Sequence, residues 1–355
     1  MLIKYLTKLV TFRTESGLAH QPEVLDLYRW FITNIKNPNF SSKILNFSGY
    51  NSLIVSPQNT NVKMVLSAHV DVVPGSDNLF NPKQVDGKIF GRGTSDMKFA
   101  VACYLHLLNS VPNLHKKGVS VVLTSDEEIG GTNGTSKLNK LGYFKSDIIF
   151  LPDGGDNFSL ITAAKGVLHI KITSKGKSAH ASRPWEGVNA IDKLNKGWQK
   201  LRQQMPIINR KSWKNTCSLT KIEGGSVVNR IPDLASFYLD IRFTDKSSLN
   251  SIIKTVRNCF GYDCDFQILA SGESYKINLT NNYIKKIKSI AKNKFDVKLQ
   301  KTRDYGSSDA RHLNLKKTPL IMFKPKCAGH HSNNEYLEIP SLNTYFNILK
   351  EFVTS

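Results

Sequence analysis

Three short runs rich in β-branched and other apolar residues, each with a histidine or an acid at or just beyond its end, most constrain the fold of this chain. They are KMVLSAHV at 63–70, VSVVLTS at 119–125 and DIIFLPD at 147–153. Runs of this kind are typical of strands buried in a largely parallel sheet. The intervening segment 96–111, DMKFAVACYLHLLNSV, has helical periodicity, so the first half predicts an α/β unit. Because ligands collect outside the carboxyl ends of strands in open α/β sheets, the ends of these runs mark the expected site.

After about residue 165 the pattern changes to strand, helix, strand, strand, helix, strand. The segments that carry it are GVLHIKITSKG, HASRPWEGVNAIDKLNKGWQKL, ASFYLDIRFT, SLNSIIKTVRNCF and DFQILAS. This order predicts a small α+β insert of the ferredoxin-like type over 166–272. A catalytic, metal-binding domain would then consist of 1–165 and 273–355, with LIMFKPKCAGHH at 320–331 rejoining its sheet.

The residues at the strand ends are of types that bind metal ions. His69 and Asp71 form an H-x-D pair after the first run. Alternation along a strand puts both side chains on one face, so Asp71 can accept a proton from one ring nitrogen and orient His69 as a ligand. Asp96 lies in GRGTSDMK, where a glycine-bearing loop enters a helix, and by itself it could equally be a helix N-cap.

Further candidates follow the other two runs. Glu127 and Glu128 come directly after another acid, and adjacent carboxylates repel one another unless a cation or full solvation compensates them. Asp153 lies in LPDGGD, where a turn is the alternative, and His331 in AGHHSNNEY competes with His330. Two imidazoles and several carboxylates form an N/O ligand set typical of dinuclear zinc, in which one carboxylate bridges ions about 3.5–4 Å apart. A non-ligating glutamate beside a ligand supplies the general base.

Seven segments, in order and over nearly the whole chain, resemble one family of hydrolases. They are HVDVVP, GRGTSDMK, TSDEEIGG, KGKSAHASRPWEG, GGSVVNRIPDLASFYLDIR, GSSDAR and HHSNNEY. The family includes succinyl-diaminopimelate desuccinylase, acetylornithine deacetylase, aminoacylase, carboxypeptidase G and the carnosinase-type dipeptidases. The resemblance implies a zinc-peptidase-like catalytic domain that hydrolyses an amide bond of a small amino-acid-derived substrate.

The resemblance also implies a role for each candidate in the catalytic domain. The implied ligands are His69 and Asp153 for one ion, Glu128 and His331 for the other, and Asp96 as the bridge. His331 is preferred to His330 because the family ligand stands three residues before an Asn–Glu pair, here Asn334–Glu335. Glu127 would take a proton from the bridging water, and Asp71 would orient His69. Two divalent ions are expected, zinc first, with cobalt or manganese as alternatives that depend on supply.

In the insert, the resemblance singles out three residues. His180 in KSAHASRP is implied to reach a neighbouring subunit's site and stabilise the oxyanion, whereas a loop histidine that caps the next helix is the alternative. Asn229 and Arg242 match substrate-binding positions, where a guanidinium would hold a substrate carboxylate at two points. The insert would then be both lid and dimerisation domain, and the active unit a homodimer.

The substrate is less constrained. Desuccinylase and deacetylase branches usually carry glutamate where this chain has Asp153, and dipeptidase and aminopeptidase branches usually carry aspartate. This favours a peptide with a free amino terminus. The chain length and compact insert, however, resemble the desuccinylase-like branch, so an N-acyl-amino-acid deacylase remains the alternative.

The rest of the chain bears on location and partners. No apolar run approaches the roughly 18–20 residues that span a bilayer, and MLIKYLTKLVTF predicts an amphipathic first helix instead of a signal peptide. The five cysteines are scattered without a CxxC pair, which predicts reduced thiols in a reducing compartment. Together with the lack of a spanning run, this predicts a cytoplasmic protein with no membrane partner.

Two other classes of function stay open at this level. The formal charge is +21, but the basic residues are spread along the chain without a nucleic-acid-binding signature, so we expect solvated lysines and no nucleic-acid partner. A weak attraction to anions is all that the charge implies. A non-catalytic binding protein on the same fold is the more distant alternative, although every expected ligand and the base are present.

Overall fold

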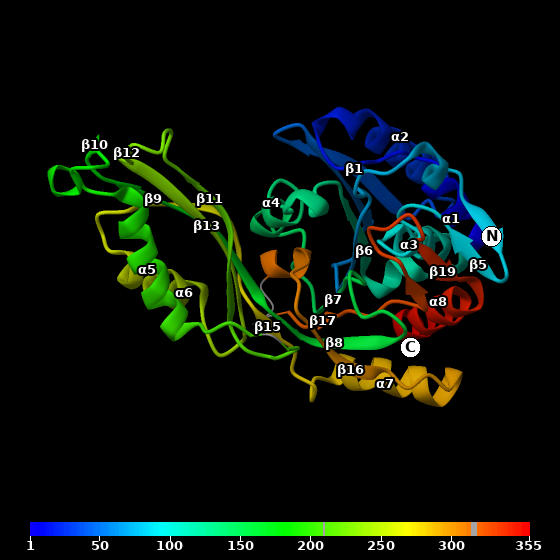
Figure 1. Cartoon of the computed structure of the whole chain (residues 1–355). Coiled ribbons are helices and arrows are strands. Elements are labelled where there is room, and N and C mark those ends of the chain that lie inside the picture. Colours follow the sequence, from blue (N-terminus) through cyan, green and yellow to red (C-terminus); the bar gives the residue numbers. More distant parts are fainter. Residues whose placement is uncertain (209, 314–317) are drawn as a thin grey trace. The chain divides into compact units, whose positions relative to one another are not determined.

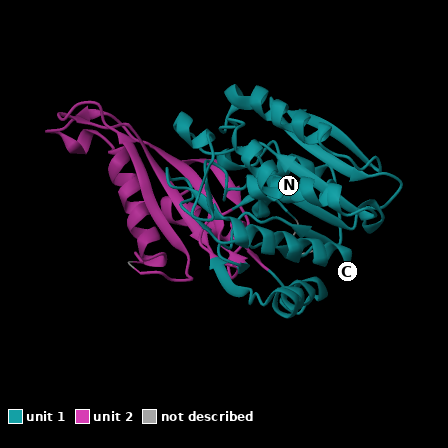
Figure 2. Cartoon of the chain, turned by 90° about the vertical axis from the view of Figure 1, so that its right-hand side faces the viewer, with its two compact units in different colours: residues 1–162, 277–303, 308–355 teal, residues 163–276, 304–307 magenta. Residues whose placement is uncertain are grey.

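The computed structural model describes residues 1–208, 210–313 and 318–355, and the chain forms two compact units (Figure 2). Unit 1 comprises Met1–Thr162, Ile277–Arg303 and Ser308–Ser355. Unit 2 comprises Ala163–Lys276 and Asp304–Ser307. From the sequence, the insert is expected over 166–272.

A six-stranded sheet forms the centre of unit 1, in the order β1–β2–β6–β3–β7–β17 (Figure 1). The strands are β1 (Phe40–Phe47), β2 (Tyr50–Pro57), β3 (Met64–His69), β6 (Val119–Thr124), β7 (Ile148–Phe150) and β17 (Leu320–Ile321). Strands β6, β3, β7 and β17 run parallel, and β1 and β2 add an antiparallel edge. Every residue of β3, β6 and β7 is buried, which explains their continuous apolar sequences. The expected α/β fold with a mostly parallel sheet is confirmed.

The helices of unit 1 pack on this sheet or on other elements of the unit. They are α1 (Leu2–Val10), α2 (Gln21–Thr33), α3 (Lys98–Ser110), α4 (Thr135–Lys140), α7 (Asn282–Phe295) and α8 (Ile339–Thr354). Helix α3 packs against β3 and contacts both α1 and α8, while α2 packs against β2 (Figure 1). All of α3 from Lys98 to Leu105 is buried, so this helix lies in the core of unit 1. Among the described residues, no helix combines the length and apolar character needed to cross a bilayer.

A second, smaller sheet of unit 1 joins segments far apart in the sequence. Its order is β18 (Cys327–Ala328), β19 (Tyr336–Glu338), β5 (Lys88–Phe90) and β4 (Lys83–Val85). Strand β5 lies just before the GRGTSDMK loop, and β19 lies just after HHSNNE. Their antiparallel pairing, with Tyr336 opposite Phe90, therefore brings these two motifs together.

Unit 2 contains a four-stranded antiparallel sheet with two helices on one side (Figure 1). Its elements are β9 (Gly166–Lys175), α5 (Ala190–Gln204), β11 (Thr216–Gly224), β13 (Leu234–Phe243), α6 (Leu249–Phe260) and β14 (Asp265–Gly272). The sheet order is β11–β13–β9–β14, and both helices contribute to one apolar core with the sheet. This is the βαββαβ order of a ferredoxin-like unit. Short strands complete the chain: β8 (Ser159–Ala164), β10 (Ala179–His180), β12 (Arg230–Ile231), β15 (Tyr275–Lys276) and β16 (Gln300–Asp304).

Candidate metal centre

The carboxyl ends of three parallel strands in unit 1 carry the expected residues. His69 is the last residue of β3 and lies opposite Thr124, the last residue of β6. Glu127 and Glu128 follow β6 in the short 3-10 helix η4 (Glu127–Ile129), and Asp153 follows β7. Because these strands are parallel, their carboxyl ends meet at one edge of the sheet.

A buried carboxylate, Glu335, fixes the Asp96 loop beside the His331 motif. Glu335 is 1% exposed and lies four residues after His331, directly before β19. It accepts hydrogen bonds from Gly93 N at 3.0 Å, Ser95 N at 2.9 Å, Ser95 Oγ at 3.0 Å and Asp96 N at 3.2 Å, and pairs with Arg92 at 2.9 Å. This carboxylate accepts from three backbone N–H groups of the loop and so holds the backbone at Asp96 in place.

Two groups of potential ligands share Asp96. In the first group, His69 Nε2 lies 3.4 Å from Asp96 Oδ1 and 3.7 Å from Asp153 Oδ1. In the second, His331 Nε2 lies 3.3 Å from Asp96 Oδ2 and 3.4 Å from Glu128 Oε2. Within each group the ligand atoms all lie within 4.8 Å of one another. Asp96 offers one oxygen to each group, which is the arrangement of a bridging carboxylate.

The orphaned nitrogen of His69 tests whether a cation fits. His69 is 1% exposed, and its Nε2 has no hydrogen-bond partner in the described structure. Its Nδ1 lies 2.9 Å from the backbone oxygen of Asp71, so in the neutral ring a proton on Nδ1 leaves the Nε2 lone pair facing two carboxylates. A buried lone pair without a donor is unfavourable, and a divalent cation would satisfy it together with both carboxylates.

Asp71 ties the two strand ends together. Its buried carboxylate accepts hydrogen bonds from Glu127 N at 3.2 Å and from Glu128 N at 3.0 Å. The same carboxylate lies 3.5 Å from His69 Nδ1, farther than the Asp71 carbonyl. The sequence favours the carboxylate as the acceptor for His69, but in the structure it faces the η4 backbone. Asp71 thus positions both His69 and the Glu127–Glu128 turn.

The first ligand group shifts the proton affinities of its own members. Burial opposes a charged imidazole at His69, but Asp153, Asp71 and Asp96 outweigh it and raise the pKa of His69 well above its ordinary value. Burial opposes ionisation of Asp96, yet the neighbouring cations hold the pKa of that carboxyl well below its usual range. Carboxylates at this edge therefore attract positive charge strongly.

The second group behaves in the same way. Asp96 and Glu128 raise the pKa of His331 to about 10.

Burial, followed by the charge of Asp153 and other carboxylates, raises the pKa of Glu127 well above its ordinary value. Glu127 belongs to neither ligand group, so its carboxylate stays available beside them.

A lysine that the sequence did not single out also lies in this site. Lys324 is 3% exposed, and its Nζ lies 3.1 Å from Asp96 Oδ1 and 4.0 Å from Asp153 Oδ1. Burial lowers the pKa of its ammonium, but Asp96, Asp153 and other acids outweigh burial and raise it. A lysine inside the apolar run LIMFKPKC is the signal that could have identified it, because lysine is almost never fully buried without a partner.

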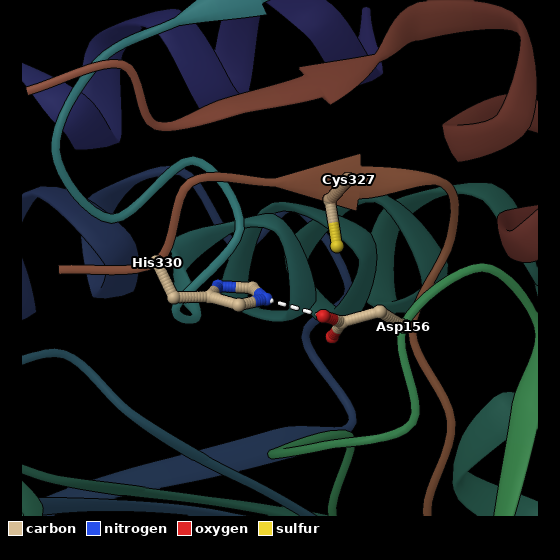
Figure 3. Close-up of side chains that lie close together, drawn as sticks. All are labelled: Asp156, Cys327 and His330. Atoms are coloured by element: carbon tan, nitrogen blue, oxygen red, sulfur yellow. Dashed lines mark hydrogen bonds and ion pairs between the residues drawn. The ribbon is translucent and has the colours of Figure 1, made fainter. Parts of the chain in front are cut away.

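A third group of possible ligands, Asp156, Cys327 and His330, lies close by and explains the choice between the two histidines (Figure 3). His330 Nε2 lies 2.7 Å from Asp156 Oδ2, and its Nδ1 lies 2.8 Å from Ser95 Oγ. Both ring nitrogens of His330 are thus engaged, and burial raises the pKa of the Cys327 thiol. His331 alone of the two faces Asp96 and Glu128.

Asp309, in the GSSDAR motif, is expected to make the stability of the metal-free protein depend on pH. It is 2% exposed, and burial raises its pKa from 3.8 to about 6. A raised pKa means that the protonated form stabilises the fold below pH 3.8, and that this contribution disappears as the pH rises through about 6. In metal-free protein, Asp309 should lower the free energy of unfolding by about 2–3 kcal/mol between pH 4 and pH 7. We expect this decrease to be absent in Asp309→Asn. Urea unfolding at both pH values measures it, and an unchanged pH dependence in the variant would contradict this assignment.

The structure places the three candidates of the insert in unit 2. His180 is exposed at the end of β10, with its Nδ1 2.8 Å from Ser182 Oγ. Asn229 lies beside it, since its backbone oxygen accepts a hydrogen bond at 2.9 Å from the residue after His180. Arg242 on β13 engages Asp240 at two points, through Nε at 2.8 Å and Nη2 at 3.1 Å. Its guanidinium thus already holds a carboxylate of the chain itself.

A family model and proteins of other organisms match most of this chain. Residues 65–355 match Peptidase family M20/M25/M40. The chain is 29% identical over 298 residues to a [LysW]-lysine/[LysW]-ornithine hydrolase of Sulfurisphaera tokodaii, covering 81% of each. It is 28% identical over 325 residues to a succinyl-diaminopimelate desuccinylase of Rickettsia bellii, covering 82% of each.

Solved structures share the fold at lower identity. A tripeptidase from Staphylococcus aureus superposes with a TM-score of 0.78 at 23% identity, covering 100% of this chain and 98% of that one. A dinuclear metal-binding peptidase of the M20 family from Bacillus subtilis superposes with a TM-score of 0.69 at 16% identity, covering 99% and 96%. The fold described above is thus that of these peptidases.

Proposed function

The chain belongs to Peptidase family M20/M25/M40 and is a metal-dependent hydrolase, and from this we propose that it cleaves an amide bond in a small peptide with a free amino terminus. The observation that carries the proposal is that Asp96 is shared by two groups of potential ligands. We assign His69, Asp96 and Asp153 to one divalent ion and Asp96, Glu128 and His331 to the other. Zinc suits this nitrogen and oxygen set, with cobalt and manganese as alternatives.

Glu127 is the proposed general base. Bound divalent ions would polarise the substrate carbonyl and acidify a shared water. Burial, followed by the charge of nearby carboxylates, raises the pKa of Glu127 in the metal-free chain, and those cations would oppose this shift by favouring the ionised form of Glu127. It then accepts the proton of the attacking water and passes it to the leaving nitrogen. Asp71 supports this step by holding the backbone of Glu127.

Asp153 is the reason for favouring a peptide. Peptidase branches of the family usually carry aspartate here, and aspartate, one methylene shorter than glutamate, changes the room beside the metal. An N-acyl amino acid is the second candidate, because the desuccinylase of Rickettsia bellii is 28% identical over most of this chain.

Hydrolysis of a small substrate panel by zinc-reconstituted protein tests the proposal. The panel contains plain dipeptides and tripeptides, N-succinyl-diaminopimelate and N-acetylornithine, with Glu127→Gln as the control. Turnover of free-amino peptides that the variant loses supports the peptidase assignment. Preference for the N-acyl substrates would replace it with the deacylase, and silence with metal bound would favour a non-catalytic role.

We further propose that unit 2 is the lid and dimerisation domain and that His180 serves the partner subunit's site. If so, a His180→Ala chain and a Glu127→Gln chain are each nearly inactive, but mixed dimers contain one intact site. Refolding the two variants together at equal concentrations should restore about a quarter of wild-type activity, since half of randomly formed dimers are mixed. Activity that stays at the level of the separate variants would place His180 in its own subunit's site or outside catalysis.

Asn229, beside His180, and Arg242 are the proposed substrate-binding residues of unit 2. For Arg242 this requires exchange of Asp240 for a substrate carboxylate, because the two now form a two-point pair. A cytoplasmic location is also proposed, and it is supported by five buried thiols, all of them free.

A further inference from the structure

Lys324 is held firmly by the backbone on which it stands. It follows β17, and its N–H donates to the oxygen of Gly155 at 2.9 Å while its carbonyl accepts from Phe158 N at 2.9 Å. Its side chain is 4% exposed. The backbone of Lys324 is thus held by two hydrogen bonds and its side chain is buried. The fold therefore fixes the position of the ammonium in the site.

The ammonium of Lys324 lies close to two carboxylate oxygens of one ligand group. Its Nζ is 3.1 Å from Asp96 Oδ1 and 4.0 Å from Asp153 Oδ1, and these are the two oxygens nearest to His69 Nε2. The oxygen of Asp96 that faces His331 is the other one, Oδ2. The two ligand groups, which look symmetrical about Asp96, therefore differ because the first also holds a lysine ammonium that is not one of its ligands.

We propose that the Lys324 ammonium competes with metal at the His69–Asp96–Asp153 position, so that the chain binds its first divalent ion at Asp96–Glu128–His331 and a second one much more weakly. The inference rests on the proposed ligand set and goes beyond it by ordering the two positions. Metal enters the weaker position either when Lys324 leaves both carboxylates or against the charge of its ammonium.

Two free-energy costs weaken metal binding at the His69–Asp96–Asp153 position relative to the other position. A buried ammonium that gives up its ion pairs must find other acceptors or carry its charge unpaired, which is strongly unfavourable. If it stays, it lies next to a divalent ion, and like charges at such separations in a buried site repel strongly. Because breaking a buried ion pair is costly, metal should bind at this position about 100-fold or more weakly than at the other.

Zinc titration of metal-free protein tests the inference. Dissociation constants come from calorimetry, and stoichiometry from elemental analysis after equilibrium dialysis. The wild type is compared with Lys324→Met, which keeps most of the volume and removes the charge. The matched control is Lys326→Met, an exposed lysine two residues along the same segment. Thermal unfolding of both metal-free variants shows whether Lys324→Met is folded.

We expect one tight zinc site in the wild type and in Lys326→Met, with a second site at least about 100-fold weaker, and two sites within about 10-fold of each other in Lys324→Met. With Mn²⁺ as the probe, two equivalents should give the spin-coupled spectrum of a metal pair in Lys324→Met at concentrations where the wild type gives the spectrum of an isolated ion.

The wild-type titration alone can overturn the inference, even if Lys324→Met does not fold. Two tight and equal sites in the wild type would show that Lys324 is no competitor. A gap that persists in folded Lys324→Met would trace the asymmetry to another cause. Zinc binding at neither position would remove the ligand set and the proposed function together, and this result is distinct from the other two.

Discussion

Replacement of Glu127 by glutamine is expected to lower kcat by about 10²–10⁴-fold while the zinc content stays that of the wild type. The amide has nearly the shape of the carboxylate but cannot accept the proton of the attacking water. Glu127 lies outside both groups of potential ligands, and its backbone N–H still bonds to Asp71 in the variant. Chemistry and metal binding should therefore separate at this residue.

The adjacent residue provides the matched comparison. Glu128 lies 3.4 Å from His331 Nε2 and belongs to a ligand group, so Glu128→Gln should reduce zinc content as well as activity. Measuring kcat, KM and zinc per chain for both variants separates the two roles. If Glu127→Gln lost its zinc, or kept its turnover, the general base would have to be sought elsewhere.

The secondary structure that forms the site could be predicted because it is encoded locally. The runs that predict β3, β6 and β7 are continuous and apolar, and all three strands are buried in a parallel sheet. The βαββαβ order of unit 2 is likewise encoded segment by segment. The alternative of Asp96 as a helix N-cap is wrong. Helix α3 begins at Lys98, its N-cap is Met97, and no side chain caps it.

What the sequence could not predict are the contacts that join distant segments. Glu335 organises the Asp96 loop from 239 residues away, and nothing near Asp96 indicates it. Lys324 lies in a run that resembles a continuous strand, yet β17 covers only Leu320–Ile321. The chain then leaves the sheet and its lysine turns to the acids. Charge pairing at this site outweighs the preference of lysine for water, and only the three-dimensional arrangement shows it.

Substitution of the shared residue, Asp96→Asn, should have the broadest effect on metal binding. Asp96 offers Oδ1 to the group of His69 and Oδ2 to the group of His331. An asparagine has one oxygen and one NH₂ group, so one of the two positions would face a donor that cannot bind a cation, and both would lose half of a shared negative charge. We expect zinc affinity to fall at both positions by more than the 10–100-fold that is typical of losing a supporting residue, and turnover to fall to background.

Asp153→Asn is the control for Asp96→Asn, because Asp153 belongs to the first group alone. If Lys324 weakens that group as inferred, Asp153→Asn should leave the tight zinc site of the wild type intact and remove only the weak one. Asp96→Asn should remove both, which elemental analysis and calorimetry can distinguish directly. An Asp96→Asn chain that kept one tight zinc site would mean that the two ligand groups are independent and that Asp96 does not bridge them. Because Lys324 would make the two positions unequal, the bridging role of Asp96 can be tested. Asp153→Asn should lose only the weak zinc site, whereas Asp96→Asn should lose both.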